Sequence, residues 1–164
     1  NPWSWLIMGR PTSFFYETPK SCGTDHCSQE VLALGTPILW WLATIAVAVV
    51  IGYWIRSFAV KRYEPPLNVI VTGIAAGYLP WFFFQKRTVF SFYAIVFEPF
   101  LILAIVYCAY VALLHFENSR NTYAFIAFIG LAIFINFIYF LPLFTGDVIT
   151  YDSWQARMWL PSWV

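Results

Sequence analysis

The sequence predicts an all-α integral membrane protein with four transmembrane helices and an N-terminal interfacial segment. Of its 164 residues, 61% are hydrophobic, 22% are aromatic and only 10% are charged. Soluble domains usually carry about 25% charged residues. The mean hydropathy is +0.69. Four apolar stretches approach the length of about 20 residues that a bilayer core requires, and the total length favours one domain.

Residues 1–35 form a mixed segment that we expect to be extracytoplasmic and interfacial. Prolines interrupt its aromatic residues, and no apolar run in it is long enough to span. Aromatic side chains beside Arg10 and Lys20 are typical of a segment at the lipid headgroups. Residue 1 is Asn, and no basic stretch with a short apolar core follows it. We therefore expect no signal peptide, and a chain that begins within a larger protein or after a cleavage.

Two cysteines in this segment, Cys22 and Cys27, enclose a loop of four residues. A disulfide is the preferred interpretation, and it would place the segment on an oxidising face. A metal site that uses both sulfurs with Asp25 and His26 is a crowded alternative, so we predict no metal. Two free thiols are the remaining alternative.

The first two spans are predicted at residues 37–55 and 67–84. Thr36 can cap the first helix, and Pro37 at its first position loses no hydrogen bond. A pair of aromatic residues lies near each end of this span, as interfacial anchors do. Pro80 removes a backbone hydrogen bond near the end of the second span, so we expect a kink there.

The third and fourth spans are predicted at residues 93–114 and 123–141. The third contains Glu98 near its start, and the fourth ends near Pro142 and Gly146. The transmembrane region then covers residues 36–146, and an aromatic, polar tail follows at 147–164.

Four crossings place both ends of the chain on the same face as the Lys86-Arg87 turn. The loops at 56–66 and 115–122 share the other face, and they hold four Lys and Arg residues against two in the Lys86-Arg87 turn. Short cytoplasmic loops carry the excess of positive charge. The sequence thus predicts a multi-pass plasma-membrane protein with both ends extracytoplasmic.

Lys86 and Arg87 are the strongest candidates for a binding site. Lys and Arg side chains at the end of a membrane helix often do no more than reach the aqueous interface with their charged groups. Here, however, we expect a span to begin just beyond Arg87, and a helix amino end presents unpaired N–H groups and positive dipole charge. Two cations there can bind an anion, and Arg contacts phosphate oxygens in a bidentate manner. The anion expected at that depth is a lipid phosphate.

Tyr93 is a further candidate for phosphate binding, and Glu98, Arg10 and Tyr78 are candidates to support the site. Tyr93 and Tyr78 could donate hydrogen bonds to a phosphate or a sugar. Glu98 is the only carboxylate in a predicted span, and we prefer a structural ion pair with Arg87 or Arg10 over a catalytic role.

Other classes of function find no support in the sequence. The formal net charge of +1 gives no electrostatic basis for nucleic-acid binding. We find no Ser-His-Asp arrangement, no pair of carboxylates and no nucleotide motif. The sequence therefore predicts no cofactor and no catalytic residue within this chain.

Several stretches, taken in order, resemble the C-terminal four-helix membrane region of the actinobacterial polyprenol-phosphate-mannose–protein mannosyltransferases, which belong to the protein O-mannosyltransferases. The stretches that carry the resemblance are Asn1-Pro2-Trp3-Ser4-Trp5, Gly9-Arg10-Pro11, Cys22 with Cys27, Leu34-Gly35-Thr36-Pro37, Trp40-Trp41, Tyr78-Leu79-Pro80-Trp81, Arg87-Thr88-Val89-Phe90-Ser91-Phe92-Tyr93, Pro99, and Arg157-Met158-Trp159-Leu160-Pro161-Ser162-Trp163. They cover nearly the whole chain, and the set is more specific than any one of them.

The resemblance implies a glycosyltransferase of the GT-C type. Such an enzyme transfers mannose, with inversion, from a polyprenyl or dolichyl phosphate to Ser or Thr of secreted proteins. Its acidic catalytic residue lies near the amino end of the full protein, outside this chain, so the partners implied are the N-terminal catalytic half, the lipid donor and a protein acceptor. We predict that this part contributes to donor binding through Arg87, Lys86 and Tyr93. Another polyprenyl-phosphate-sugar glycosyltransferase is the second interpretation, and a non-catalytic scaffold or transporter subunit is the third.

Overall fold

Four long helices and a small sheet make up the fold. The computed structural model describes residues 2–20, 22–23, 26–84 and 86–164. Its elements, in order, are η1 (Pro2–Ser4), β1 (Thr12–Glu17), β2 (Cys27–Ala33), α1 (Pro37–Ala59), α2 (Pro65–Tyr78), η2 (Leu79–Phe82), η3 (Ser91–Val96), α3 (Glu98–His115), α4 (Arg120–Thr145), β3 (Ile149–Thr150), α5 (Tyr151–Gln155) and η4 (Pro161–Trp163), where η denotes a 3-10 helix.

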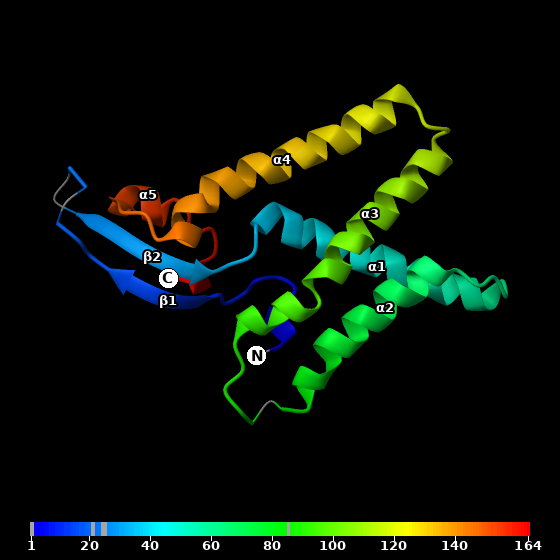
Figure 1. Ribbon diagram of the computed structural model, residues 1–164, viewed down its shortest axis with the longest axis horizontal. Helices are drawn as coiled ribbons and strands as arrows, with labels where there is room; N and C mark the ends of the chain where they lie inside the picture. Colours follow the sequence, from blue (N-terminus) through cyan, green and yellow to red (C-terminus); the bar gives the residue numbers. More distant parts are fainter. Residues whose placement is uncertain (1, 21, 24–25, 85) are drawn as a thin grey trace.

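The four helices run between two ends of the molecule. The sheet, α5, both chain ends and the connection between α2 and α3 lie toward the left in Figure 1. The connections from α1 to α2 and from α3 to α4 lie at the right (Figure 1). Successive long helices thus run in opposite directions (Figure 1).

Among the described residues, three helices are long and apolar enough to cross a membrane: α1, α3 and α4. The predicted second span at 67–84 is shorter as an α-helix, because α2 ends at Tyr78. Its 14 residues extend about 21 Å, less than the bilayer core of about 30 Å. Pro80 cannot supply the next helical N–H, so the chain continues as the 3-10 helix η2 instead of a kinked α-helix.

The remaining helix boundaries also differ from the predicted ones. The third helix begins at Glu98, five residues after the predicted start, with Pro99 in its first turn where its missing N–H costs nothing. The fourth helix continues past Pro142 to Thr145 and ends at Gly146, whose φ is 74°. Pro142 therefore lies inside the last turn and does not end the helix.

The amino end of α1 is capped by a side chain from α4. Thr36 makes no side-chain capping bond, contrary to the sequence prediction. Instead, the N–H of Ile38 donates to Oδ1 of Asn136, at 3.0 Å. Asn136 is buried, so it satisfies a helix-end donor that no water reaches.

The prediction of an all-α fold is wrong at the amino end. Strands β1 and β2 form an antiparallel hairpin, and β3 pairs with the other edge of β2. Cys27 lies opposite Thr150 and Ser28 opposite Ile149, so residues 147–164 are joined to the N-terminal segment. Paired strands satisfy backbone groups that an irregular segment would leave to water.

Residues 2–9, here called the strap, are held by side chains from distant parts of the chain. Five consecutive carbonyl oxygens, those of residues 5–9, each accept a side-chain hydrogen bond. In order, the donors are Trp40, Thr44, Trp41, Trp163 and Ser162. Helix α1 and the C-terminal tail thus fix the strap against the helices.

Candidate functional site

Lys86 and Arg87 lie in the turn between η2 and η3, and both are exposed. The N–H of Arg87 donates to the carbonyl of Phe84 at 3.0 Å, which closes the turn. Within the described ranges, neither cation has an ion-pair partner. Both charges are therefore free to meet an anion.

The ring of Tyr93, in η3, is fixed by two aromatic neighbours. It stacks on the indole of Trp81, with centroids 4.4 Å apart and planes 15° apart. Phe92 contacts its ring as well, at 4.7 Å. The Tyr93 hydroxyl has no hydrogen-bond partner among the residues that the structure describes. The ring of Tyr93 is thus fixed in place, while its hydroxyl is available to donate a hydrogen bond to a ligand.

The other sequence candidates are placed differently. The hydroxyl of Tyr78 donates to the carbonyl of Pro2 at 2.9 Å, so its proton is already used in the strap. Arg10 is exposed. The expected ion pair of Glu98 with Arg87 or Arg10 is not formed, because the described residues contain one salt bridge, between Arg62 and Glu64. Glu98 is instead the first residue of α3.

This position of Glu98 also corrects the argument from the helix dipole. The span does not begin just beyond Arg87, because η3 separates the turn from α3. The amino end of α3 carries a carboxylate of its own, which is the charge that this end of a helix favours. The positive charge of the candidate site therefore comes from Lys86 and Arg87 themselves.

The turn adjoins the N-terminal hairpin. The hydroxyls of Thr12, at the start of β1, and Ser91, at the start of η3, lie 3.2 Å apart. The rings of Phe14 and Phe92 pack at 5.4 Å. Strand β1 therefore begins directly beside the segment that contains Tyr93.

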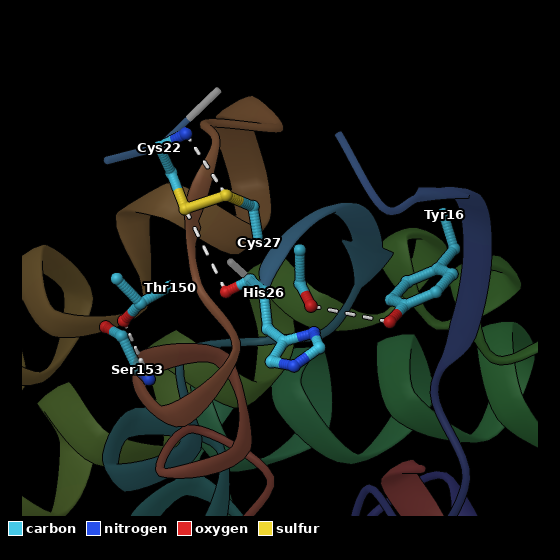
Figure 2. Close-up of a disulfide and its surroundings, with 7 residues drawn as sticks. Tyr16, Cys22, His26, Cys27, Thr150 and Ser153 are labelled. Atoms are coloured by element: carbon cyan, nitrogen blue, oxygen red, sulfur yellow. Dashed lines mark hydrogen bonds between the residues drawn. A yellow bond between two sulfur atoms is a disulfide. The ribbon is translucent and has the colours of Figure 1, made fainter. Parts of the chain in front are cut away.

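Cys22 and Cys27 form a disulfide, which closes the loop between β1 and β2 (Figure 2). Asp25, which the alternative metal site requires, lies outside the described residues. Cys108, in α3, is the free cysteine of the described part and is half-buried.

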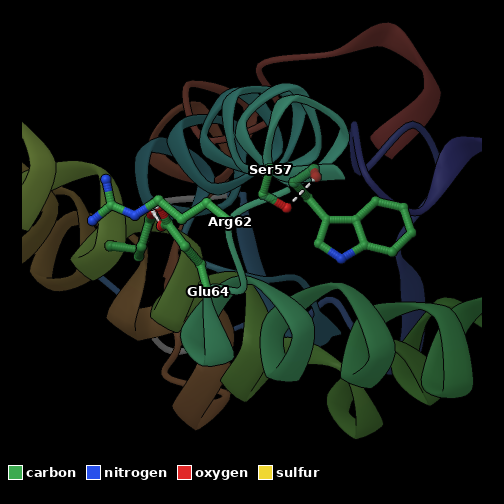
Figure 3. Close-up of polar contacts among 5 residues, drawn as sticks. Ser57, Arg62 and Glu64 are labelled. Carbon is green, nitrogen blue, oxygen red and sulfur yellow. Dashed lines mark hydrogen bonds and ion pairs between the residues drawn. The ribbon is translucent and has the colours of Figure 1, made fainter. Parts of the chain in front are cut away.

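The opposite end of the helices carries the remaining loop charges. Arg62 and Glu64 form an ion pair at 3.3 Å between α1 and α2 (Figure 3). The hydroxyl of Tyr107 donates to the other oxygen of Glu64 at 2.9 Å. Ser57 donates to the carbonyl of Trp54 at 2.6 Å, at the end of α1. Arg62, Glu64 and Tyr107 thus bind one another.

Sequence reasoning missed a buried acid in the sheet. Glu30, on β2, is buried, and its Oε2 accepts a 2.6 Å hydrogen bond from the indole N–H of Trp154. Its neighbour Gln29 donates to the carbonyl of Gly146 at 2.7 Å. From Ser28 onward the positions alternate between buried and half-exposed, but polar Glu30 is on the buried side and apolar Val31 is on the half-exposed side. The sequence therefore lacks the apolar–polar alternation that indicates a strand.

Comparison with known proteins identifies relatives of this chain. The family described as the C-terminal four TMM region of protein-O-mannosyltransferase matches residues 1–163. This chain belongs to that family.

Individual members of the protein-O-mannosyltransferase family support the assignment. Proteins named polyprenol-phosphate-mannose–protein mannosyltransferase from Corynebacterium glutamicum and Mycolicibacterium smegmatis are 35% and 32% identical to it. Each alignment covers 99% of this chain but only 31% and 32% of the relative. A Saccharomyces cerevisiae protein, named dolichyl-phosphate-mannose–protein mannosyltransferase 5, is 26% identical over 99% of the chain. The chain thus spans about a third of the length of the bacterial relatives.

The stretches that carry the family resemblance meet in space. The carbonyl oxygen of Trp5 accepts a hydrogen bond from the indole N–H of Trp40, and the indole N–H of Trp163 donates to the carbonyl of Met8. Trp81 stacks on Tyr93. Segments from the start, middle and end of this protein-O-mannosyltransferase region therefore pack together in one structure.

Proposed function

We propose that this chain forms the lipid-donor side of a protein O-mannosyltransferase. In the whole enzyme, mannose would pass from polyprenyl-phosphate-mannose to Ser or Thr of a secreted protein. The observation that carries the proposal is the exposed pair Lys86 and Arg87, which has no carboxylate partner in the described part of the chain. Tyr93, whose ring stacks on Trp81, follows this pair in η3.

The chemistry of the transfer explains the need for such a site. When the bond from mannose to phosphate breaks, negative charge increases on the departing phosphate. Cations held at that position stabilise the charge as it develops. The acceptor hydroxyl must lose a proton to a base, and we assign that base to the part of a longer enzyme that this chain does not include. A polyprenyl-phosphate carrying another sugar would present the same phosphate, but the relatives' names specify mannose.

We infer that the turn faces the outside of the plasma membrane, at the lipid headgroups. The disulfide between Cys22 and Cys27, at the same end of the helices as the turn, supports this orientation because disulfides persist in oxidising compartments. A fourth crossing would use α2 continued by η2, whose four residues add about 8 Å to the length. The strap and hairpin would then lie at the interface.

The test is the donor dependence of mannose transfer by the full-length enzyme in membranes. Replacing Arg87 by Ala should raise the KM for polyprenyl-phosphate-mannose about tenfold or more, because a hydrogen bond to a charged group contributes roughly 1.5–3 kcal/mol. Arg56→Ala, which removes an exposed cation at the other end of α1, should leave this KM unchanged. An unaltered donor KM in Arg87→Ala would contradict the proposal.

A further inference from the structure

Trp81 is anchored to the rigid part of the helices. Its indole N–H donates to the carbonyl of Gly77, at 2.9 Å. A Cβ at Gly77 would lie 2.8 Å from Cβ of Phe97, and Phe97 is fully buried. The indole is therefore fixed to the place where α2 packs closely against the start of α3.

From this anchor, contacts reach both parts of the proposed phosphate site. The carbonyl of Trp81 accepts from the N–H of Phe84 at 3.4 Å, and the carbonyl of Phe84 accepts from the N–H of Arg87 at 3.0 Å. On its flat face, the indole stacks on Tyr93. One residue thus contacts the chain that leads into the turn and the ring that follows it.

The strap holds Trp81 from another direction. The ring of Trp5 packs against Trp81 with centroids 5.8 Å apart. Trp5 is buried, and its carbonyl accepts the indole N–H of Trp40 at 2.9 Å. The position of Trp81 is therefore fixed by α1 and the strap as well as by α2.

We propose that Trp81 is a positioning residue for the donor phosphate, which holds Tyr93 and the Lys86-Arg87 turn in one arrangement before the lipid binds. This proposal rests on the proposed function of the turn. Side chains that are already ordered lose less conformational freedom on binding, and affinity rises accordingly. Without the indole, Tyr93 loses its stacking partner and must be ordered by the donor itself.

The test uses the full-length enzyme, with the KM for polyprenyl-phosphate-mannose, the KM for an acceptor peptide and kcat measured for each variant. Trp81→Leu should raise the donor KM about fivefold to tenfold and leave the peptide KM unchanged. Trp81→Phe should restore most of the donor KM, because a phenyl ring can still stack on Tyr93. If Trp81→Leu does not accumulate, Trp81→Met takes its place, since it fills space without a flat ring.

The matched control is Trp54→Leu. Trp54 also donates an indole hydrogen bond, to Oδ1 of Asn68 at 2.8 Å, but it lies near the opposite end of α1. Its loss should lower thermal stability without changing the donor KM. An equal rise of the donor KM in this control, or in Trp81→Phe, would overturn the proposal.

Arg87→Ala separates the two proposals. If it raises the donor KM while Trp81→Leu does not, the positioning role of Trp81 is wrong and the phosphate site stands. If neither variant changes the donor KM, the phosphate site itself is wrong.

Discussion

The indole N–H of Trp163 donates a hydrogen bond to the carbonyl oxygen of Met8 at 2.7 Å, which joins the two ends of the chain. Both residues are buried. Ser162, next to Trp163, donates to the adjoining carbonyl, that of Gly9. The C-terminal tail is thus part of the structure that supports the strap, and through Trp5 it supports the proposed site.

Trp163→Phe should therefore destabilise the protein. The ring volume is largely kept, but the buried carbonyl of Met8 loses its side-chain donor, which costs about 1–3 kcal/mol. Thermal unfolding of the detergent-extracted protein measures the effect. Trp159→Phe is the control, because the Trp159 indole N–H has no hydrogen bond among the described residues and its side chain is exposed. Equal melting temperatures for the two variants would contradict this role of Trp163.

The cap on α1 predicts a second stability effect. Asn136→Leu keeps the apolar packing of α4 but leaves the N–H of Ile38 without its acceptor. We expect a loss of about 1–3 kcal/mol in the free energy of unfolding. Asn121→Leu, at an exposed position of the same helix, should change little. If both substitutions cost the same, the cap does not stabilise α1.

The disulfide should be found intact in protein extracted without reductant. Non-reducing mass spectrometry should recover a peptide in which Cys22 is joined to Cys27, while Cys108 reacts with an alkylating reagent after unfolding. Closing so short a loop lowers the entropy of the unfolded chain, which stabilises the folded protein by about 2 kcal/mol. Reductant should therefore lower the melting temperature. Alkylation of both Cys22 and Cys27 without reduction would contradict the pairing.

The proposed orientation can be tested with single cysteines in a Cys108→Ser background. A membrane-impermeant maleimide added to intact cells should label Lys86→Cys. Lys61→Cys, in the exposed loop between α1 and α2, should react only after the membrane is opened. The reverse pattern would place the turn inside the cell and rule out the proposed donor site.

The sequence predicted the helices well because membrane spans leave a strong local signal. Long apolar runs located α1, α3 and α4, and Pro37 identified the start of α1. Pro80 was recognised as a break, but a proline pattern alone does not distinguish a kink from the end of a helix. For this reason the predicted second span extends beyond the end of α2 at Tyr78.

The sheet and the strap could not be predicted because their bonds join distant parts of the chain. Ile149 pairs with Ser28, and a two-residue strand such as β3 leaves almost no local pattern. Asn136 stood out as a polar residue in an apolar span, but only the packing of α4 against α1 reveals that it caps Ile38.

The sequence shows the charged residues of the candidate site, but it does not show the contacts that hold the neighbouring side chains in place. Lys86 and Arg87 are visible as cations beside an apolar run, and the motif that ends at Tyr93 follows them. The stack of Tyr93 on Trp81 depends on the turn that brings η3 back against η2, so no spacing rule specifies it. Glu98 forms no ion pair with any other residue that the structure describes, and this likewise depends on where α3 begins.

The most direct measurement of the central proposal is equilibrium binding of polyprenyl monophosphate to the full-length enzyme in lipid nanodiscs. Arg87→Ala should weaken the affinity at least about tenfold, and Arg87→Lys should keep part of it, because a lysine retains the charge but not the bidentate contact. Arg56→Ala should bind as the unaltered protein does. Equal affinity for the unaltered protein and Arg87→Ala would show that this turn does not hold the donor phosphate.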